Sequence, residues 1–530
     1  MRSLRVLSLL GALLAVSCSD TPPAATAPNA PAVAIEDATV DALQQAMTKG
    51  QLTSRRLTEI YLERIDAIDR KGPTLRSVIE TNPDALSIAD ALDRERRDNK
   101  VRGPLHGIPV LVKDNLDTAD KMMTTAGSLA LEGPAPARDA FVVERLRAAG
   151  AVLLGKANLS EWANFRSTKS ASGWSARGGL VKNPYALDRN ACGSSSGTGA
   201  SIAANLATVG IGTETDGSIV CPSSANGLVG IKPTVGLVSR AGIVPISHSQ
   251  DTAGPMTRTV KDAALVLAAI AGADPRDAAT KASEGQPRAD YLAALDVNGL
   301  KGARVGVLRG RFAGYSPSAD RVFEAAVAKL KELGAVIVDP VDLAGGYDDS
   351  ELQVLQYEFK ADLNAYLATR TGVPVKSLAD VIAFNEQHRD REMPHFGQEL
   401  FIASEKKGPL TDKVYRDALA KSQRLAREEG IDKALRTHKL DALVALTLNA
   451  AWTTDLINGD HFMGASSTPA AVAGYPSITV PAGDVSGLPI GMSWMGPAWS
   501  EARLIKYAYA FEQATKHRRA PDLRATVMGK

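Results

Sequence analysis

The chain has 530 residues, of which 45% are hydrophobic and 23% charged, and it contains three cysteines. This composition excludes a collagen, a coiled coil, a disulfide-rich scaffold and an acidic disordered chain, because each of these classes needs a stronger bias. The formal net charge of +2, from 61 Lys and Arg against 59 Asp and Glu, predicts no general attraction to nucleic acid, while 45 glycines and 5% aromatic residues favour the α/β class.

Residues 1–17 have the pattern of an export signal. Arg2 and Arg5 precede an apolar run over residues 6–16, which ends among small residues. A helix needs about 20 apolar residues to cross a bilayer, so this run is too short for a permanent transmembrane anchor. We therefore expect residues 1–17 to be a signal peptide.

The end of this signal resembles a bacterial lipobox. Residues 14–18 read Leu-Ala-Val-Ser-Cys, and the lipobox cysteine, here Cys18, becomes lipidated; a plain secretory signal with a chance cysteine is the alternative. A Pro-, Ala- and Thr-rich stretch over residues 18–35 predicts a flexible tether before a folded domain at 36–530. We expect a chain exported to the cell envelope or periplasm, which contacts a membrane only through a lipid at Cys18, with the outer membrane favoured by Ser19.

The rest of the chain alternates between short apolar runs and helical patterns. Buried strands are predicted at residues 108–112, 151–154, 303–308, 335–338 and 442–446. Helices are predicted at residues 57–68, 140–149, 319–333 and 501–514. This alternation is typical of a largely parallel sheet covered by helices.

Two partial matches to known motifs do not predict the functions of those motifs. Residues 150–157 fit the start of a phosphate-binding loop, but Ala157 stands where a magnesium-binding Ser or Thr is required. Residues 193–197 match G-x-S-x-G, yet turn-like residues precede them and the strand-like run follows, which is the reverse of a nucleophile elbow. The seven histidines are scattered, so neither a zinc site nor a Ser/His triad is predicted.

The middle of the chain is rich in glycine and serine. Residues 173–254 hold 14 of the 45 glycines. Because glycine permits tight turns and close approach of backbones, we expect the functional site in this region.

This region resembles the signature of the amidase signature family over residues 193–256. Upstream, GIPVLVKDN is similar to the catalytic-lysine strand of that family and GKANLSEWANF to the helix that follows it; AGYPSITVPAG and GLPIGMSWMG resemble the segments that close its sheet. The resemblance covers residues 36–515. It implies one large α/β/α domain, in which a twisted mixed β-sheet is covered by helices on both faces.

Matched position by position, the resemblance implies a catalytic triad of Ser218 as nucleophile, Ser194 as bridging serine and Lys113 as base. A serine hydroxyl is a weak nucleophile until a base removes its proton, and lysine can do so only when it is neutral, which burial favours. Lys113 ends an apolar strand, but Asp114 and Asp117 follow closely and would keep it charged if either paired with it. The resemblance implies that the lysine points inward and that the adjacent Asp114 does not pair with it.

The backbone N–H groups of Thr215, Asp216, Gly217 and Ser218 are expected to form the oxyanion hole. The resemblance also implies a cis peptide bond before Ser194, and it implies no metal and no cofactor. Most of five other polar residues in matching segments are expected to make buried hydrogen bonds: Asn158, Glu161, Asp188, Asp251 and Arg258.

The sequence departs from many family members at Asp216, which precedes Gly217, and at Val220, which replaces an arginine. In this it is most similar to the peptide amidase branch, which hydrolyses C-terminal carboxamides of peptides through an acyl-enzyme and releases ammonia. An amidase for aryl acylamides or fatty acid amides and a catalytically silent envelope lipoprotein are the alternatives. Export argues against the family's subunit that acts on charged tRNA, and the oligomeric state is left open.

Two of the cysteines, Cys192 and Cys221, lie close in sequence to the predicted catalytic serines. We interpret them as small packing residues. An oxidising envelope would also allow a disulfide between them.

Overall fold

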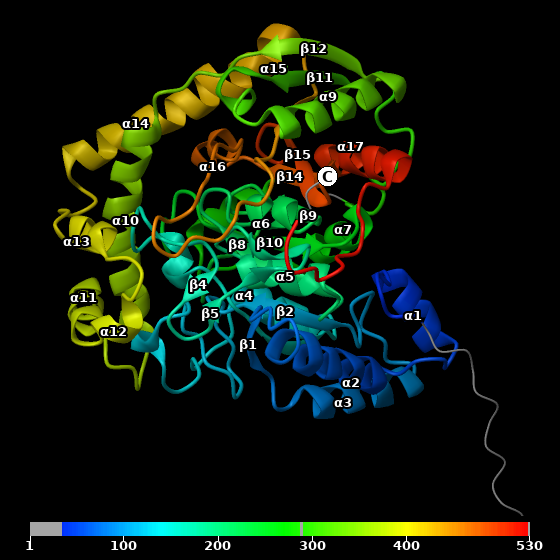
Figure 1. Ribbon diagram of the computed structural model, residues 1–530, viewed down its shortest axis with the longest axis vertical. Coiled ribbons are helices and arrows are strands. Elements are labelled where there is room, and N and C mark those ends of the chain that lie inside the picture. The colour runs from blue at the N-terminus through cyan, green and yellow to red at the C-terminus, as the bar shows by residue number, and fades with distance from the viewer. Residues whose placement is uncertain (1–33, 287–289, 528–530) are drawn as a thin grey trace, which may run out of the picture. The chain divides into compact units, whose positions relative to one another are not determined.

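An 11-stranded sheet forms the centre of the fold (Figure 1) in a computed structural model that describes residues 34–286 and 290–527. Its strand order is β1-β3-β2-β8-β10-β9-β14-β15-β13-β11-β12. The strands are β1 (Val78–Thr81), β2 (Pro109–Lys113), β3 (Val152–Ala157), β8 (Val209–Glu214), β9 (Val229–Lys232), β10 (Thr252–Thr257), β11 (Arg304–Leu308), β12 (Val336–Val341), β13 (Ala442–Leu446), β14 (Ser477–Val485) and β15 (Leu488–Met495). Two small sheets pair β4 (Trp174–Ser175) with β5 (Gly179–Leu180) and β6 (Lys182–Asn183) with β7 (Ala186–Asn190).

The large sheet is mixed. Strands β3, β2 and β8 run parallel to one another, as do β13, β11 and β12, whereas β10, β9, β14 and β15 pair antiparallel between them. This confirms the mixed sheet that the resemblance implied, and the expectation of a largely parallel sheet is wrong. The reason is local: β14 and β15 are joined only through Ser486 and Gly487, and so tight a connection allows only antiparallel pairing.

Helices cover both faces of the sheet, and α10 to α14 form an arm beside it (Figure 1). The α-helices are α1 (Val40–Thr48), α2 (Ser54–Arg64), α3 (Ala85–Arg97), α4 (Phe141–Ala148), α5 (Ser196–Ala203), α6 (Val220–Ala225), α7 (Val260–Ile270), α8 (Lys281–Glu284), α9 (Pro317–Glu332), α10 (Asp348–Thr369), α11 (Leu378–Gln387), α12 (Arg389–Glu392), α13 (Glu399–Glu405), α14 (Lys413–Ala426), α15 (Asp432–His438), α16 (Thr468–Ala473) and α17 (Glu501–Thr515). Short 3-10 or π-helical segments are η1 (Ile65–Arg70), η2 (Leu129–Leu131), η3 (Glu161–Asn164), η4 (Ala278–Thr280), η5 (Gly310–Phe312) and η6 (Arg427–Ile431).

Most of the predicted elements are present. Strands β2, β3, β11 and β13 lie at their predicted positions, and α4, α9 and α17 match their predicted helices closely. Strand β12 is also found, but the prediction that both of its faces are buried is wrong. It is an edge strand, and Val336 is 45% exposed. The first predicted helix is shorter than expected, because α2 ends at Arg64 and continues as the π-helical turn η1.

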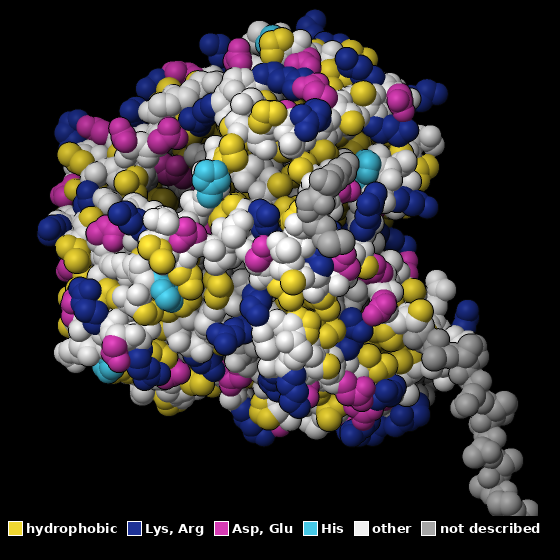
Figure 2. Space-filling view, viewed as in Figure 1, with side chains coloured by type: hydrophobic (Ala, Val, Ile, Leu, Met, Phe, Trp, Pro, Cys, Tyr) yellow, Lys and Arg dark blue, Asp and Glu magenta, His cyan; other side chains and the backbone are white. Residues whose placement is uncertain are grey.

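The predictions for residues 1–33, including the signal peptide and Cys18, lie outside the described residues. From Ile35 onward, the described residues form one compact unit. None of the helices in the described ranges is long and apolar enough to span a membrane. Basic and acidic side chains are interspersed over the face shown in Figure 2.

The parallel strands at one side of the sheet bring distant segments together. Residue Val112 of β2 is in register with Ile211 of β8, so both strands end at the same edge of the sheet. Lys113 is the last residue of β2, and the loop 215–218 follows the last residue of β8. Ligands of open α/β sheets bind at such carboxyl ends of strands, and the predicted site residues meet there.

Candidate active site

Lys113 is fully buried at the end of β2. Its Nζ donates hydrogen bonds to Ser194 Oγ, at 2.7 Å, and to Thr213 Oγ1, at 2.9 Å. Burial lowers the pKa of Lys113 from its ordinary 10.5 to about 7, although the charges of Asp251 and Glu214 oppose this fall. A large fraction of the amine is therefore neutral near neutral pH, and the neutral amine can accept a proton.

The two acids that follow Lys113 in the sequence are held by other groups, as the resemblance implied for Asp114. The Asp114 carboxylate lies 3.9 Å from Lys156 Nζ and 3.4 Å from a guanidinium nitrogen of Arg177. The Asp117 carboxylate accepts a hydrogen bond of 2.8 Å from the Tyr366 hydroxyl. Both carboxylates point away from the lysine amine.

Ser194 follows a cis peptide bond with Gly193, as the resemblance implied. It is fully buried, and its carbonyl accepts a hydrogen bond of 3.0 Å from the N–H of Ser160. The next residue, Ser195, donates its N–H to the carbonyl of Ser218 at 3.2 Å. The structure therefore brings the segments of both predicted catalytic serines together, and the Lys113 amine is hydrogen-bonded to Ser194.

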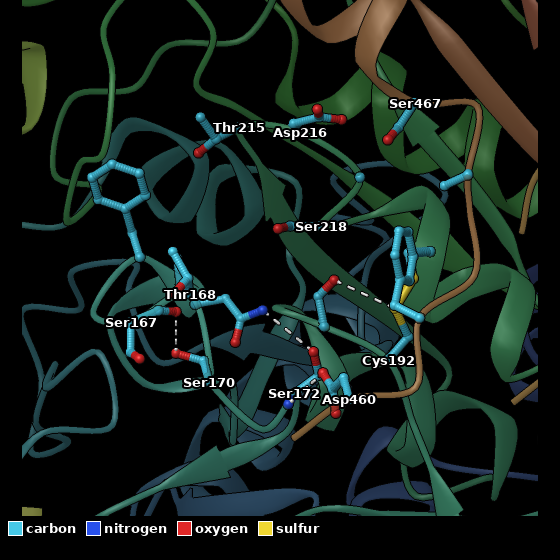
Figure 3. A pocket seen from close by; sticks show the side chains of 18 of the residues that line it. Ser167, Thr168, Ser170, Ser172, Cys192, Thr215, Asp216, Ser218, Asp460 and Ser467 are labelled. Carbon is cyan, nitrogen blue, oxygen red and sulfur yellow. Dashed lines mark hydrogen bonds between the residues drawn. A yellow bond between two sulfur atoms is a disulfide. The ribbon is translucent and has the colours of Figure 1, made fainter. Parts of the chain in front are cut away.

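Residues 215–218 form the turn between β8 and α6. Gly217 has φ +77°, in the left-handed region that favours glycine, and a Cβ there would come within 3.0 Å of Ser467 Oγ. Ser218 is 8% exposed and lines a cavity of about 560 Å³. Figure 3 shows the Ser218 hydroxyl near the middle of this cavity, with Thr215 and Asp216 on one side and Ser170, Ser172 and Asp460 on the other.

Two buried acids hold this turn in place. Glu214 Oε2 accepts hydrogen bonds from the N–H groups of Ile219, at 2.7 Å, and Val220, at 3.0 Å, so it fixes the start of α6 directly after Ser218. Asp251 accepts a hydrogen bond of 2.5 Å from the Thr215 hydroxyl. Burial raises the pKa of Asp251 to about 6, despite the hydrogen bonds that it accepts.

Sequence reasoning missed the roles of Thr213 and Glu214. The signal for Glu214 is its place just before a helix start, where free N–H groups need an acceptor. Thr213 gave no such signal, because it meets Lys113 across 100 residues of chain. Of the five other polar residues considered, four are buried, as expected: Asn158, Glu161, Asp251 and Arg258. Asp188 is half-exposed.

Cys192 and Cys221 form a disulfide, which the sequence had left open. Both cysteines line the cavity. The bond links the segment just before Ser194 to helix α6 just after Ser218, and Trp452 packs against it. It thus ties together the two segments that carry the predicted catalytic serines.

One group in the described part of the chain has the donor set of a metal site. Ligand atoms of His248, Glu358 and Asp362 lie within 4.8 Å of one another. The Glu358 carboxylate already accepts hydrogen bonds from Ser249 Oγ, at 2.9 Å, and from the Tyr415 hydroxyl, at 2.7 Å. The internal hydrogen bonds account for this cluster without an ion.

Comparison with known proteins agrees with this geometry. Residues 56–505 match the family model for amidases. The solved structure of native peptide amidase from Stenotrophomonas maltophilia is 55% identical, covers 92% of this chain and 99% of that chain, and has a TM-score of 0.88. An amidase family protein from Bacillus anthracis is 40% identical, with 92% and 93% covered and a TM-score of 0.84.

A curated relative extends the similarity to plants. A protein of Arabidopsis thaliana named as a probable amidase is 47% identical over 498 residues, which are 92% of each chain. Together with the family match over residues 56–505, this places the chain in the amidase signature family, and the protein is an amidase.

Proposed function

We propose that the protein hydrolyses carboxamides through a Ser-Ser-Lys triad, with Ser218 as nucleophile, Ser194 as proton relay and Lys113 as base. The observation that carries this proposal is the hydrogen bond of 2.7 Å between Lys113 Nζ and Ser194 Oγ in a fully buried site. Burial lowers the pKa of this lysine to about 7, where it can exchange protons near neutral pH.

In the first half of the reaction, neutral Lys113 accepts the proton of Ser194 as Ser194 accepts the proton of Ser218. The Ser218 oxygen attacks the carbonyl carbon, and the carbonyl electron pair moves onto its oxygen. When the intermediate collapses, the C–N bond breaks, Ser194 gives its proton to the leaving nitrogen, and Lys113 restores that proton to Ser194. Ammonia leaves, and an acyl ester of Ser218 remains.

In the second half, water attacks this ester through the same relay and releases the carboxylic acid. The negative oxygen of each tetrahedral intermediate needs preorganised donors. The backbone N–H groups of residues 215–218 supply them, and each such donor lowers the barrier by about 3–4 kcal/mol in comparable sites. Glu214 and Asp251 hold this turn, so its N–H groups need not reorganise during the reaction.

We infer that the substrates are C-terminal carboxamides of peptides. The similarity to peptide amidase, at 55% identity over 92% of this chain, supports this substrate class. The cavity supports it too, because Ser170 and Ser172 offer polar groups to a peptide while Phe165 and Trp452 offer apolar surface to its side chains.

A substrate panel tests this inference. Ammonia release from peptide amides is expected to exceed release of amine or ammonia from acyl anilides and fatty acid amides by at least about tenfold in kcat/KM, because only peptide amides can use the polar side of the cavity. The Ser218→Ala variant serves as the blank. Activity confined to anilides or fatty amides would contradict the substrate class while leaving the amidase chemistry intact.

We also propose that the protein is exported and anchored through a lipid on Cys18. The disulfide between Cys192 and Cys221 supports export, because such bonds persist in oxidising compartments. In a bacterial host fed labelled palmitate, the unsubstituted protein is expected to incorporate the label and Cys18→Ala is expected not to. Absence of label from the unsubstituted protein, or equal labelling of the two, would contradict the anchor.

A further inference from the structure

Asp216 is the acid of the cavity wall that lies closest in sequence to Ser218. Figure 3 shows its carboxylate on the same side of the cavity as Thr215 and directed toward Ser467. Its Oδ1 is buried and accepts no hydrogen bond from residues 34–286 or 290–527. A buried acceptor without a donor is unfavourable until a ligand supplies one. Because rotation about the Cβ–Cγ bond is soft, an N–H that enters the cavity can engage either oxygen.

A second carboxyl group lies behind Asp216. Gln250 Nε2 donates hydrogen bonds to Glu351 Oε1, at 2.9 Å, and to the Thr215 carbonyl, at 3.4 Å. Gln250 therefore bridges Glu351 to Thr215, the residue before Asp216. Leu355, one helical turn after Glu351 on α10, lines the cavity. The same face of α10 therefore contributes an acid behind the cavity wall and an apolar side chain to the wall itself.

The two carboxyl groups have different surroundings. Burial and the neighbouring Asp216 raise the pKa of Glu351 well above its ordinary value, which favours a proton on Glu351. Burial also raises the pKa of Asp216, but hydrogen-bonding interactions of its carboxyl group with the side chains of Ser467 and Thr468, and the charge of Lys232, oppose this rise; Oδ1 is the oxygen left without a donor. Because only Asp216 lines the cavity and has these opposing neighbours, a shared proton favours Glu351 over Asp216.

We propose that Asp216, backed by Glu351, binds an N–H on the α-nitrogen of the substrate's C-terminal residue. This inference rests on the proposed peptide amidase function and names the atom that this site recognises. In every peptide amide, the α-nitrogen is separated from the scissile carbonyl carbon by one carbon atom. It must therefore lie close to Ser218, as Asp216 does. Fatty acid amides and simple acyl anilides lack this nitrogen and leave the carboxylate without a donor.

Three carboxamides with one side chain test the proposal: phenylalaninamide, N-acetylphenylalaninamide and 3-phenylpropanamide, which lacks the α-nitrogen. Their Kd values are measured by calorimetry on Ser218→Ala, so that binding is read without turnover. Binding of the two compounds with an α-nitrogen is expected to exceed binding of 3-phenylpropanamide. Adding Asp216→Asn is expected to reduce this preference by about tenfold to a hundredfold. If Asp216→Asn weakens binding of phenylalaninamide more than binding of N-acetylphenylalaninamide, the favoured donor is the charged ammonium group. If it weakens binding of both compounds equally, the favoured donor is the neutral N–H that both can offer.

Asp460→Asn is the matched control, because Asp460 also lines the cavity. Unlike Asp216 Oδ1, its carboxylate already accepts hydrogen bonds from the Ser172 N–H, at 2.9 Å, and from Trp452 Nε1, at 3.1 Å. This variant is expected to change all three Kd values by a common factor. The proposal is overturned if Asp216→Asn also acts by a common factor, or if Ser218→Ala shows no preference for an α-nitrogen. Failure of the proposed function has a different signature, namely no ammonia release from phenylalanine amides by the enzyme with Ser218 intact.

Discussion

Replacing Ser218 by alanine is expected to lower kcat/KM for a peptide amide by about 10⁴- to 10⁶-fold. The substitution removes the only atom that forms the acyl-enzyme in the proposed mechanism. Water would then have to attack the amide directly in a site built around the serine oxygen. Ammonia release under single-turnover and steady-state conditions measures the loss, and mass spectrometry of a slow substrate should detect an acyl group on the Ser218 enzyme but not on the variant.

Ser223→Ala provides the matched control. Ser223 lies in α6, five positions after Ser218, and is fully buried. Its hydroxyl makes no hydrogen bond with any residue that the structure describes, so its loss removes the same atom without a role in the reaction. We expect activity close to that of the unsubstituted enzyme. Equal losses in the two variants, or substantial turnover by Ser218→Ala, would place the nucleophile elsewhere.

The components of the site could be predicted because short segments carry them. Lys113 ends a visibly apolar strand, and Gly217 stands beside Ser218 where the backbone must turn. The surrounding contacts could not be predicted in the same way. Thr213 reaches Lys113 only because β2 and β8 lie side by side in the sheet, and sequence spacing does not encode which strands become neighbours.

The errors about the fold have a similar cause. A pattern of apolar runs identifies strands, yet it does not determine their direction or their place in the sheet. Strand β12 has the apolar character of a central strand but lies at the edge, and the hairpin of β14 and β15 breaks the parallel order. The pairing of Cys192 with Cys221 likewise depends on how α5 and α6 are placed, which is a property of the folded sheet.

The pH dependence of the reaction offers the sharpest test of Lys113 as the base. Burial lowers the pKa of Lys113 to about 7, and only the neutral amine can accept a proton. We therefore expect kcat/KM to rise about tenfold per pH unit below this pKa and to level off above it. The profile is measured with one peptide amide from pH 5 to pH 9; a flat profile across this range would contradict the assignment.

Lys113→Ala is expected to reduce kcat/KM by about 10³- to 10⁴-fold at neutral pH and to abolish the rise near pH 7. The loss should exceed that in Ser194→Ala, since Lys113 is the final proton acceptor in the proposed relay. Lys113→Arg keeps the positive charge but cannot act as a base, because a guanidinium stays protonated at all these pH values. We expect this variant to be as inactive as Lys113→Ala. Full activity in Lys113→Ala would refute the proposed base.

Protein stability distinguishes loss of the base from loss of the fold. The pKa of Lys113 is about 7 in the folded protein against an ordinary 10.5, so the unfolded chain binds more protons between these values and stability rises with pH in that window. At pH 7 the folded state therefore bears the cost of keeping this amine out of water. Lys113→Met removes the amine but nearly keeps the buried side-chain volume, so it relieves that cost without leaving a large cavity, and we expect its Tm at pH 7 not to fall although its activity is lost.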